Sequence, residues 1–400
     1  MEVKKITIVG QPMYNIGDVA ACKALVKLIK EKYNCKIDLL FFENTNIDEE
    51  FRNISDVKIS KSLPVVNKYQ KLIRILFPKL YHFFSFNKND YKLFSDSDFV
   101  LVAPGGLEFG LYKEWNYLWI LSLLVGQNKY FGIYSRSIGD FREKSFNDRL
   151  FKQQTVKYLK LSKFNGLRDS RSQKSADDLQ IPFFPSIDVV FSSKPDFTDI
   201  DRSNFLQQIS GDYIVFTPSA FDWHPKYTKY DPIKFTELYL EILNTVLKST
   251  DLKIVMLPHI YKENNDEIYF DSLIEKCSQP ARVFVLRNNY NSDLYQYIVS
   301  QGKLSIIFRL HQTIFAVNNH IPFISVSYEH KMVDMMSILG LQKNMVNLED
   351  LLEGRVNISN VIKASLTNNE DNSYLITAQQ NANKIAMESF NSLTGKIAKL

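Results

Sequence analysis

The chain has 400 residues, which is enough for two domains of ordinary size, each with its own hydrophobic core. Hydrophobic residues make up 45% of the sequence and the net charge is +5, so the composition excludes disordered and fibrous classes and gives no reason to expect a nucleic-acid partner. The longest strongly apolar stretch, 117–125, is far shorter than the roughly 20 residues of a membrane-spanning helix.

The N-terminal residues and the cysteines predict a cytoplasmic protein. Residues 1–10 alternate as a first β-strand does and lack the long apolar run of a signal peptide. Cys22, Cys35 and Cys277 are scattered thiols without metal-ligand spacing, which favours a reducing compartment and no structural zinc.

The first half of the chain alternates short β-branched runs with helical patterns. Strands are predicted at 6–10, 37–42, 99–103, 130–134 and 164–167, with helices at 18–32 and 147–161. Continuous apolar strands separated by helices indicate a parallel sheet that is covered on both faces.

A polar stretch at 192–203 predicts a boundary between domains 1–195 and 196–400. After it, strands are predicted at 213–217, 253–257, 283–286, 304–308 and 323–326, helices at 232–248, 267–277, 292–300 and 311–318, and a terminal helix around 375–389. The predicted fold is therefore α/β, with two Rossmann-like doubly wound domains facing a cleft and a C-terminal helix.

The segment 67–92 combines basic and aromatic residues. It holds six Lys or Arg against one acid, Asp90, with aromatic rings between them. This mixture suits peripheral contact with an anionic membrane, where rings lie at the headgroup level. An ordinary amphipathic helix with inward aromatic rings and solvated lysines is the alternative.

Several residues that could act chemically follow the predicted strands of the first domain. Asn15 and Asp18 stand at the start of the first helix, where Asp18 is either a first-turn acid that the helix dipole favours or a base for a sugar hydroxyl. Gly105 and Gly106, followed by Glu108, form a turn after the third strand, and a ligand could approach its backbone there. Arg168 follows another strand and is either an anion ligand or the partner of Asp169 on the surface.

The sharpest pattern lies in the second domain, where a buried strand runs directly into Arg309, Leu310 and His311 before a helix. The next strand ends shortly before Lys331. Three cationic groups at adjacent strand ends predict a receptor for a small, highly charged anion, and a neighbouring phosphate would keep His311 protonated as a general acid. The alternative for His311 is a structural role at the helix start.

Taken in chain order, these motifs resemble the polysaccharide pyruvyl transferases. The matching elements are Asn15-Ile16-Gly17-Asp18, Pro104-Gly105-Gly106, 135–139, Arg168-Asp169 with Ser172, Asp188, Arg309-Leu310-His311, 321–323 and 328–331. The resemblance implies a GT-B-type fold, an acceptor side in the first domain and a donor site in the second. It also implies phosphoenolpyruvate as co-substrate, no metal or other cofactor, and transfer of pyruvate to a sugar of a surface glycan as a cyclic ketal.

The same resemblance assigns roles to individual residues. Donor binding falls to Arg168, Arg309, Leu310 and Lys331, with His311 as the general acid and Asp18 as the base or acceptor contact. Two positions depart from the family pattern: Gln312 follows His311 where a small residue is usual, and Leu107 replaces the third glycine of the usual trio.

The acceptor is expected to be a saccharide, with a lipid-linked form as one option. Its candidate contacts are Asn15, Gly105, Gly106, Glu108, Trp223, His224 and His259. Trp223 could stack on a sugar ring or, alternatively, cover the core from a loop. Asp266 lies in the same loop as His259 and is expected to line the same region.

Two other functions are compatible with the predicted fold. A GT-B nucleotide-sugar glycosyltransferase would share the architecture, but the residue eight positions after Glu329 is Ser337, so the paired glutamates of many retaining members are missing. A glycan-binding partner of an assembly complex is the second alternative. It has no need of a proton donor and a base together, which argues against it.

Overall fold

The chain forms two compact units in the computed structural model. Unit 1 comprises residues 1–13, 18–193 and 383–400, and unit 2 comprises residues 14–17 and 194–382. The structure describes residues 3–11, 15–41, 48–51, 54–60, 68–80, 94–106, 108–110, 112, 114–195, 197–198, 200, 204–221, 224–261, 266–287, 291–367 and 371–399.

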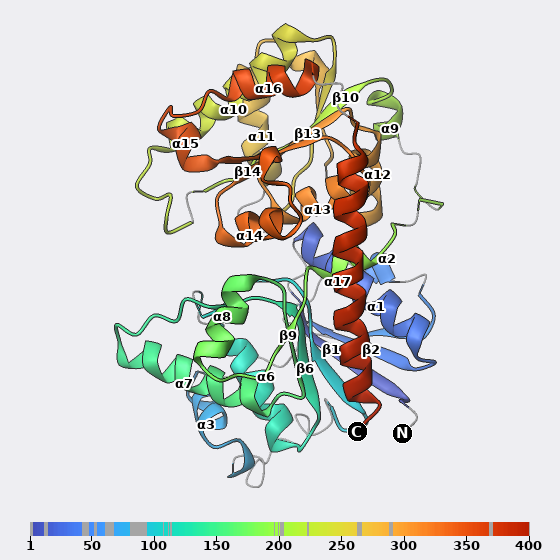
Figure 1. The fold of residues 1–400 in the computed structure, drawn as a ribbon, viewed down its shortest axis with the longest axis vertical. Helices are drawn as coiled ribbons and strands as arrows, with labels where there is room; N and C mark the ends of the chain where they lie inside the picture. Colours follow the sequence, from blue (N-terminus) through green and yellow to red (C-terminus); the bar gives the residue numbers. More distant parts are fainter. Residues whose placement is uncertain are drawn as a thin grey trace. The chain divides into compact units, whose positions relative to one another are not determined.

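Unit 1 is built on a seven-stranded parallel sheet with strand order β3-β2-β1-β4-β6-β8-β9 (Figure 1). The strands are β1 (Lys5–Gln11), β2 (Lys36–Phe41), β3 (Val57–Ser60), β4 (Phe99–Val102), β6 (Phe131–Arg136), β8 (Phe164–Leu167) and β9 (Phe184–Pro185). A separate short pair joins β5 (Phe109–Gly110) to β7 (Ile138–Gly139). All four residues of β4 are buried, which explains its continuous apolar sequence.

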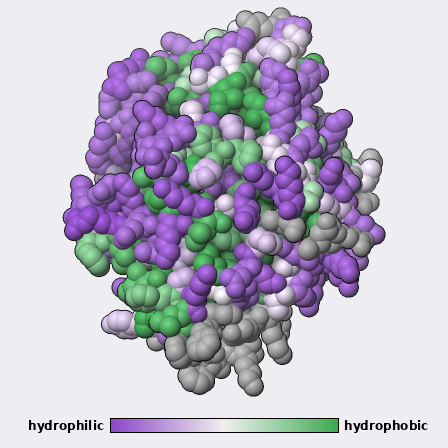
Figure 2. All heavy atoms as spheres, turned by 60° about the horizontal axis from the view of Figure 1, so that its bottom comes forward, coloured by the Kyte–Doolittle hydropathy of each residue, from purple (hydrophilic) through white to green (hydrophobic). Residues whose placement is uncertain are grey.

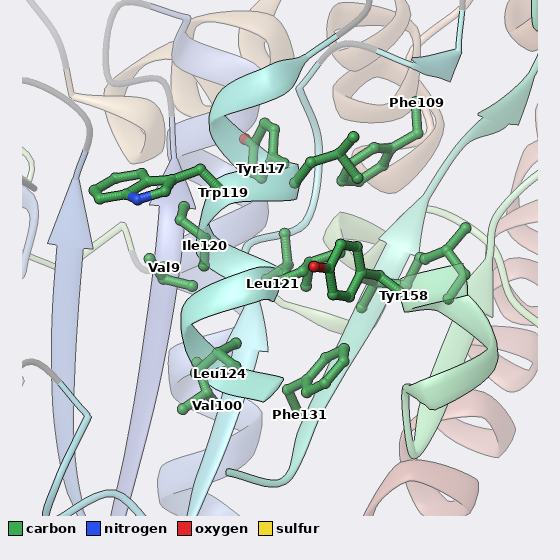
Figure 3. Close-up of a cluster of buried hydrophobic side chains, with 14 of the residues drawn as sticks. Val9, Val100, Phe109, Tyr117, Trp119, Ile120, Leu121, Leu124, Phe131 and Tyr158 are labelled. Carbon is green, nitrogen blue, oxygen red and sulfur yellow. The ribbon is translucent and has the colours of Figure 1, made fainter. Parts of the chain in front are cut away.

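The helices of unit 1 are α1 (Ile16–Lys32), α2 (Asp48–Phe51), α3 (Lys68–Leu76), α6 (Trp115–Gly126), α7 (Phe146–Leu161) and α8 (Ser170–Asp178), followed by the 3-10 turn η1 (Val189–Ser192). The first two residues of α1 group with unit 2. Helix α6 is apolar on nearly all sides because it lies inside the core, where its side chains meet those of β4, β6 and α7 (Figure 3). This burial accounts for the apolar stretch 117–125. Among the described helices, none has both the length and the hydropathy to cross a membrane.

Unit 2 contains a six-stranded parallel sheet with strand order β12-β11-β10-β13-β14-β15. The strands are β10 (Tyr213–Thr217), β11 (Lys253–Met256), β12 (Val283–Val285), β13 (Leu304–Ile307), β14 (Phe323–Ser327) and β15 (Met345–Asn347). The helices are α9 (Asn204–Gln208), α10 (Pro232–Ser249), α11 (Asp266–Lys276), α12 (Ser292–Gln301), α13 (Leu310–Asn318), α14 (His330–Ile338), α15 (Leu348–Leu352) and α16 (Ile358–Thr367), with the short turns η2 (Pro280–Arg282) and η3 (Gln342–Asn344). Both sheets have the strand order of a doubly wound fold, so the predicted α/β class with two parallel sheets is confirmed.

The C-terminal helix α17 (Ser373–Ile397) confirms the predicted terminal helix but divides between the units. Its residues from Asn383 onward group with unit 1, where the Tyr134 hydroxyl donates a hydrogen bond to the Ala386 carbonyl and the Tyr134 and Phe390 rings pack edge to face. The division between Ser193 and Lys194 lies near the boundary predicted after residue 195, whereas the predicted second domain contained the whole helix.

Candidate active site

Several of the predicted site residues follow the strands at which each sheet reverses its winding order. In unit 2 the reversal lies between β10 and β13, and Arg309 and His311 come directly after β13. In unit 1 it lies between β1 and β4, where Asp18 follows β1 and Gly105 follows β4. Ligands of doubly wound folds bind outside the carboxyl ends of the strands at such reversals, so each unit carries a candidate subsite.

Arg309 is held by a buried ion pair in unit 2. Its Nη2 atom lies 3.1 Å from Oδ1 of Asp266, and the two side chains are only 6% and 1% exposed. Asp266 also accepts hydrogen bonds from the backbone amides of His259 and Ile260, at 2.8 and 3.0 Å. Burial lowers the pKa of Arg309, but the Asp266 carboxylate raises it, and the net shift is upward. The guanidinium is therefore a fixed, permanent cation.

The His311 ring lies between a glycine and a second histidine of the same unit. It stacks on His259 with ring centroids 6.1 Å apart and an interplanar angle of 19°. A Cβ atom on Gly17 would lie 2.0 Å from Nδ1 of His311, so a glycine is required at this position. The segment before α1 is fixed there by the bridge between Asn15 and Ile260 and by a 3.0 Å hydrogen bond from the Gly17 amide to the Asn15 side chain.

His259 is where the cationic groups of unit 2 converge. Burial lowers its pKa well below the usual range, and the charges of Arg309, His311 and Lys331 each lower it further. The imidazole is therefore neutral at physiological pH. Among the described residues, its Nδ1 atom and Nε of Arg309 have no hydrogen-bond partner, although both are buried. Buried polar atoms of this kind fit a ligand site.

Lys331 stands in the first turn of α14 and pairs with Glu329 at 2.8 Å. Burial raises the pKa of Glu329, but Lys331 lowers it, and the net shift is downward. His224 lies in the same region and packs edge to face on the Tyr328 ring at 5.6 Å. Burial lowers the pKa of His224, which Lys331 lowers further against the opposing effect of Glu329.

Replacing Gly17 by alanine is expected to displace the His311 ring. The new methyl group would overlap the imidazole, and overpacking of this kind typically costs 1–3 kcal/mol, so the midpoint of thermal unfolding should fall by roughly 5 °C and turnover with it. Gly395→Ala in α17 is the matched control, because a Cβ there meets nothing within 4 Å. Equal thermal unfolding midpoints and turnover for both variants would contradict the close contact.

In unit 1, Asp18 is fixed by the glycine turn after β4. Its Oδ1 accepts a 2.8 Å hydrogen bond from the Gly106 amide, and the carboxylate is buried. Gly105 and Gly106 both have positive φ, 75° and 73°. A Cβ on Gly105 would lie 2.3 Å from Oδ1 of Asp18, so this turn requires glycine and approaches the carboxylate with its backbone.

A fully buried arginine, Arg136, lies behind the same turn. Its guanidinium donates to the Ala103 carbonyl at 2.9 Å, pairs with Glu114 at 3.2 Å and stacks over the Tyr117 ring at 4.4 Å. A Cβ on Gly106 would lie 3.1 Å from its Nη2 atom. Burial lowers the pKa of Arg136, but Tyr117 and Glu114 raise it, and the net shift is upward. Arg136 therefore supports the turn that holds Asp18.

Glu114 is expected to make the stability of the protein depend on pH near neutrality. Burial raises its pKa from 4.5 to about 7, against the lowering effect of Arg136. A carboxyl whose pKa is raised by folding stabilises the folded state, and this stabilisation is complete below the pKa of the unfolded chain. It is lost as pH rises through the folded-state pKa of about 7. The free energy of unfolding of the wild type should therefore fall by about 3 kcal/mol relative to Glu114→Gln between about pH 4 and pH 8. Chemical denaturation at each pH measures this, with Glu388→Gln on α17 as the exposed control. Parallel pH profiles of wild type and Glu114→Gln would contradict it.

Arg168 is buried in unit 1 and pairs with Asp188, not with Asp169. Nη1 of Arg168 lies 2.7 Å from Oδ2 of Asp188, and its Nε donates to the Ser137 hydroxyl at 3.2 Å. Asp169 instead caps α8 by accepting from the amide and hydroxyl of Ser172, both at 2.8 Å. The alternative of a surface pair between Arg168 and Asp169 is therefore wrong.

The remaining predicted residues are divided between the units. Unit 2 contains Arg309, Leu310, His311, Lys331, His224, His259 and Asn15, and unit 1 contains Asp18, Gly105, Gly106, Glu108 and Arg168. Trp223 and Leu107 lie outside the described residues. Sequence reasoning missed the support from Arg136 and Glu114. It also missed that Asp266 forms an ion pair with Arg309, for which the only signal was an acid in the loop directly before a predicted helix.

Comparisons with known proteins identify both the family and the fold. The family described as polysaccharide pyruvyl transferase matches residues 15–330. A putative UDP-N-acetylglucosamine 2-epimerase from Listeria monocytogenes is similar with a TM-score of 0.61 and 10% identity, covering 98% of this chain and 95% of that one. The UDP-GlcNAc 2-epimerase of Methanocaldococcus jannaschii is similar with a TM-score of 0.59 and 11% identity, covering 98% of this chain and 99% of that one. UGT2 of Phytolacca americana is similar with a TM-score of 0.59 and 11% identity, covering 100% of both chains. At these identities the neighbours show the fold alone, and the predicted GT-B fold class is confirmed.

Proposed function

The chain belongs to the polysaccharide pyruvyl transferase family, and from this premise we propose that it transfers pyruvate from phosphoenolpyruvate to a sugar as a cyclic ketal. The observation that carries the proposal is the cationic cluster of unit 2. The charges of Arg309, Lys331 and His311 all lower the pKa of the buried imidazole of His259. Nε of Arg309 has no hydrogen-bond partner among the described residues. Such a cluster matches the dense negative charge of a carboxylate and a phosphate.

In the proposed reaction His311 protonates the methylene carbon of phosphoenolpyruvate, which makes the central carbon electrophilic. Arg309 and Lys331 balance the charges of the carboxylate and the phosphate, and Leu310 contributes its backbone at the start of α13. A sugar hydroxyl forms a C–O bond to the central carbon and loses its proton to Asp18. The C–O bond to phosphate then breaks with its electron pair, and a second hydroxyl closes the ketal as its proton leaves with phosphate. No metal or other cofactor takes part in this scheme.

The base assigned to Asp18 is a buried carboxylate of unit 1. The carboxylate of Asp18 keeps its orientation through the Gly106 amide. Arg168 is assigned to the donor as well, although its bond to Asp188 also gives it a structural role in unit 1.

The acceptor is proposed to be a saccharide of a surface glycan, with a lipid-linked form as one option, modified in the cytoplasm. Two observations support this: the family is described by polysaccharide, and the described cysteines are free and buried. His224 and Glu108, which are both buried polar side chains, are proposed acceptor contacts. Asn15, Gly105, Gly106, His259 and Trp223 complete the proposed acceptor contacts.

Phosphate release from phosphoenolpyruvate by the purified protein tests the proposal, with galactose- and N-acetylmannosamine-containing acceptors present or absent. We expect acceptor-dependent release of phosphate and a higher thermal unfolding midpoint with phosphoenolpyruvate. Stabilisation by nucleotide sugars alone would favour the glycosyltransferase alternative, in which the Arg309 site binds a diphosphate. Glycan binding without affinity for either donor would favour a non-enzymatic binding protein.

A further inference from the structure

Unit 1 exposes a continuous stripe of large apolar side chains along α3. Tyr69, Ile73 and Phe77 succeed one another at helical spacing and are 78%, 50% and 56% exposed. The Phe77 amide still donates to the Ile73 carbonyl, so the three side chains point from one face of the helix. The alternative predicted for this segment, aromatic rings packed inward, is therefore wrong for Tyr69 and Phe77. The part of segment 67–92 beyond residue 80 lies outside the described residues.

The stripe leads into a groove of about 720 Å³, which we name the α3 groove. Apolar side chains from distant parts of the chain line it, namely Phe77, Leu80, Tyr130 and Leu161, which are between 43% and 57% exposed. Figure 2 shows hydrophobic side chains gathered at the surface beside hydrophilic ones on the face that this view presents. Contiguous exposed apolar area of this kind marks an interaction surface.

The charged residues that line the α3 groove are all basic. They are Lys79, Lys129, Lys157 and Lys163, and no aspartate or glutamate lies among the described lining residues. Lys129 is fixed by donating to the carbonyls of Ser95 and Ser97, at 2.6 and 3.1 Å. Lys79, Lys157 and Lys163 are exposed, and the Lys163 ammonium lies 5.3 Å from the centre of the Tyr130 ring.

This combination selects one kind of partner. Aromatic and aliphatic side chains that enter the headgroup region of a bilayer, with lysines beside them at the phosphates, are typical of proteins that lie on anionic membranes. A second copy of this chain fits poorly, because a two-fold interface would place the same lysines against one another. Protein interfaces are also depleted of lysine at their centres.

We propose that the α3 groove and its stripe form a docking surface for an anionic lipid membrane. Phe77, Leu80 and Tyr130 enter the headgroup region, and Lys79, Lys157 and Lys163 contact lipid phosphates. The inference rests on the proposed function only for the reason to dock, which is that docking would bring the enzyme to a lipid-linked acceptor. Binding to the lipid surface itself requires neither donor nor acceptor.

Cosedimentation of the full chain with vesicles tests the proposal. One set contains phosphatidylcholine alone, and the other contains equal parts of phosphatidylcholine and phosphatidylglycerol. We expect binding to the anionic vesicles that weakens with added salt. Changing Lys79, Lys157 and Lys163 together to Gln should lower the partition coefficient roughly 100-fold, and Phe77→Ser with Leu80→Ser roughly 10-fold or more.

Matched control variants remove the same number of charges and the same number of large exposed apolar side chains elsewhere. The charge control changes three exposed lysines of unit 2 together to Gln, namely Lys234, Lys276 and Lys363. The apolar control changes the exposed Phe146 and Ile233 together to Ser. These controls should bind vesicles as the wild type does.

Equal binding to neutral and anionic vesicles, or equal loss of vesicle binding in groove and control variants, would overturn the proposal. So would a wild-type dimer in sedimentation velocity that Phe77→Ser dissociates. Phosphate release with a water-soluble acceptor should be the same in groove variants and wild type, so a failure of docking is distinguishable from a failure of the proposed reaction.

Discussion

Replacing Arg309 by methionine is expected to abolish donor binding and to destabilise unit 2. The change leaves the Asp266 carboxylate, 1% exposed, without its cationic partner. Breaking a buried ion pair from one side typically costs about 3–5 kcal/mol. We expect the lower end of that range, because two backbone amides still donate to Asp266. Chemical denaturation measures the loss, and calorimetric titration with phosphoenolpyruvate measures binding.

A double variant separates the structural effect of Arg309 from its effect on the donor. Arg309→Met with Asp266→Asn removes both charges, so it should recover much of the stability that the single variant loses, without recovering donor binding. Arg309→Lys keeps the charge but not the planar fork and should bind the donor more weakly than the wild type. Normal donor affinity in the stable double variant would exclude Arg309 from the donor site.

Most of the strand ends could be predicted from the sequence, since buried parallel strands are continuous apolar runs. The structure places β8 and β10 at the predicted residues, and α13 begins one residue before its predicted start. Parallel strands end at one edge of a sheet, so the positions of Arg309 and Asp18 followed from the pattern alone.

The partners of the buried charges could not be predicted in the same way. In a sequence a charged residue indicates a solvated position, yet Arg136 is fully buried among two rings and a carboxylate. Arg168 has an acid beside it in sequence but pairs with Asp188, twenty positions away. Spacing along the chain does not encode which carboxylate tertiary packing brings to an arginine.

The division of α17 between the units was missed for a related reason. Helical spacing in the last residues predicts a helix and its buried face, but not the surface that covers this face. Tyr134 and Tyr33 of unit 1 both donate hydrogen bonds to carbonyls of this helix, at Ala386 and Thr394. No local signal in the sequence connects residues so distant from one another.

Replacing His311 by alanine is expected to reduce turnover about 10²- to 10⁴-fold, the usual contribution of a positioned general acid. Donor binding should change little, because Arg309 and Lys331 remain. Single-turnover measurements of phosphate release give the rate of the chemical step, and added imidazole should partly restore it by entering the space that the side chain leaves. His320→Asn is the matched control. This residue lies near the opposite end of α13 with φ of 57°, a conformation that asparagine tolerates.

The comparison with Gly17→Ala makes the His311 prediction specific to the imidazole. Gly17→Ala keeps the imidazole but displaces it, so its turnover should lie between those of wild type and His311→Ala, and imidazole should not restore it. A structural His311 would give a different result: both variants would lower the thermal unfolding midpoint and lose turnover in proportion, with no rescue by imidazole. The proton donor is thus distinguished from a packing residue by chemical rescue, because imidazole can replace a lost acid in the cavity but cannot correct a displaced ring.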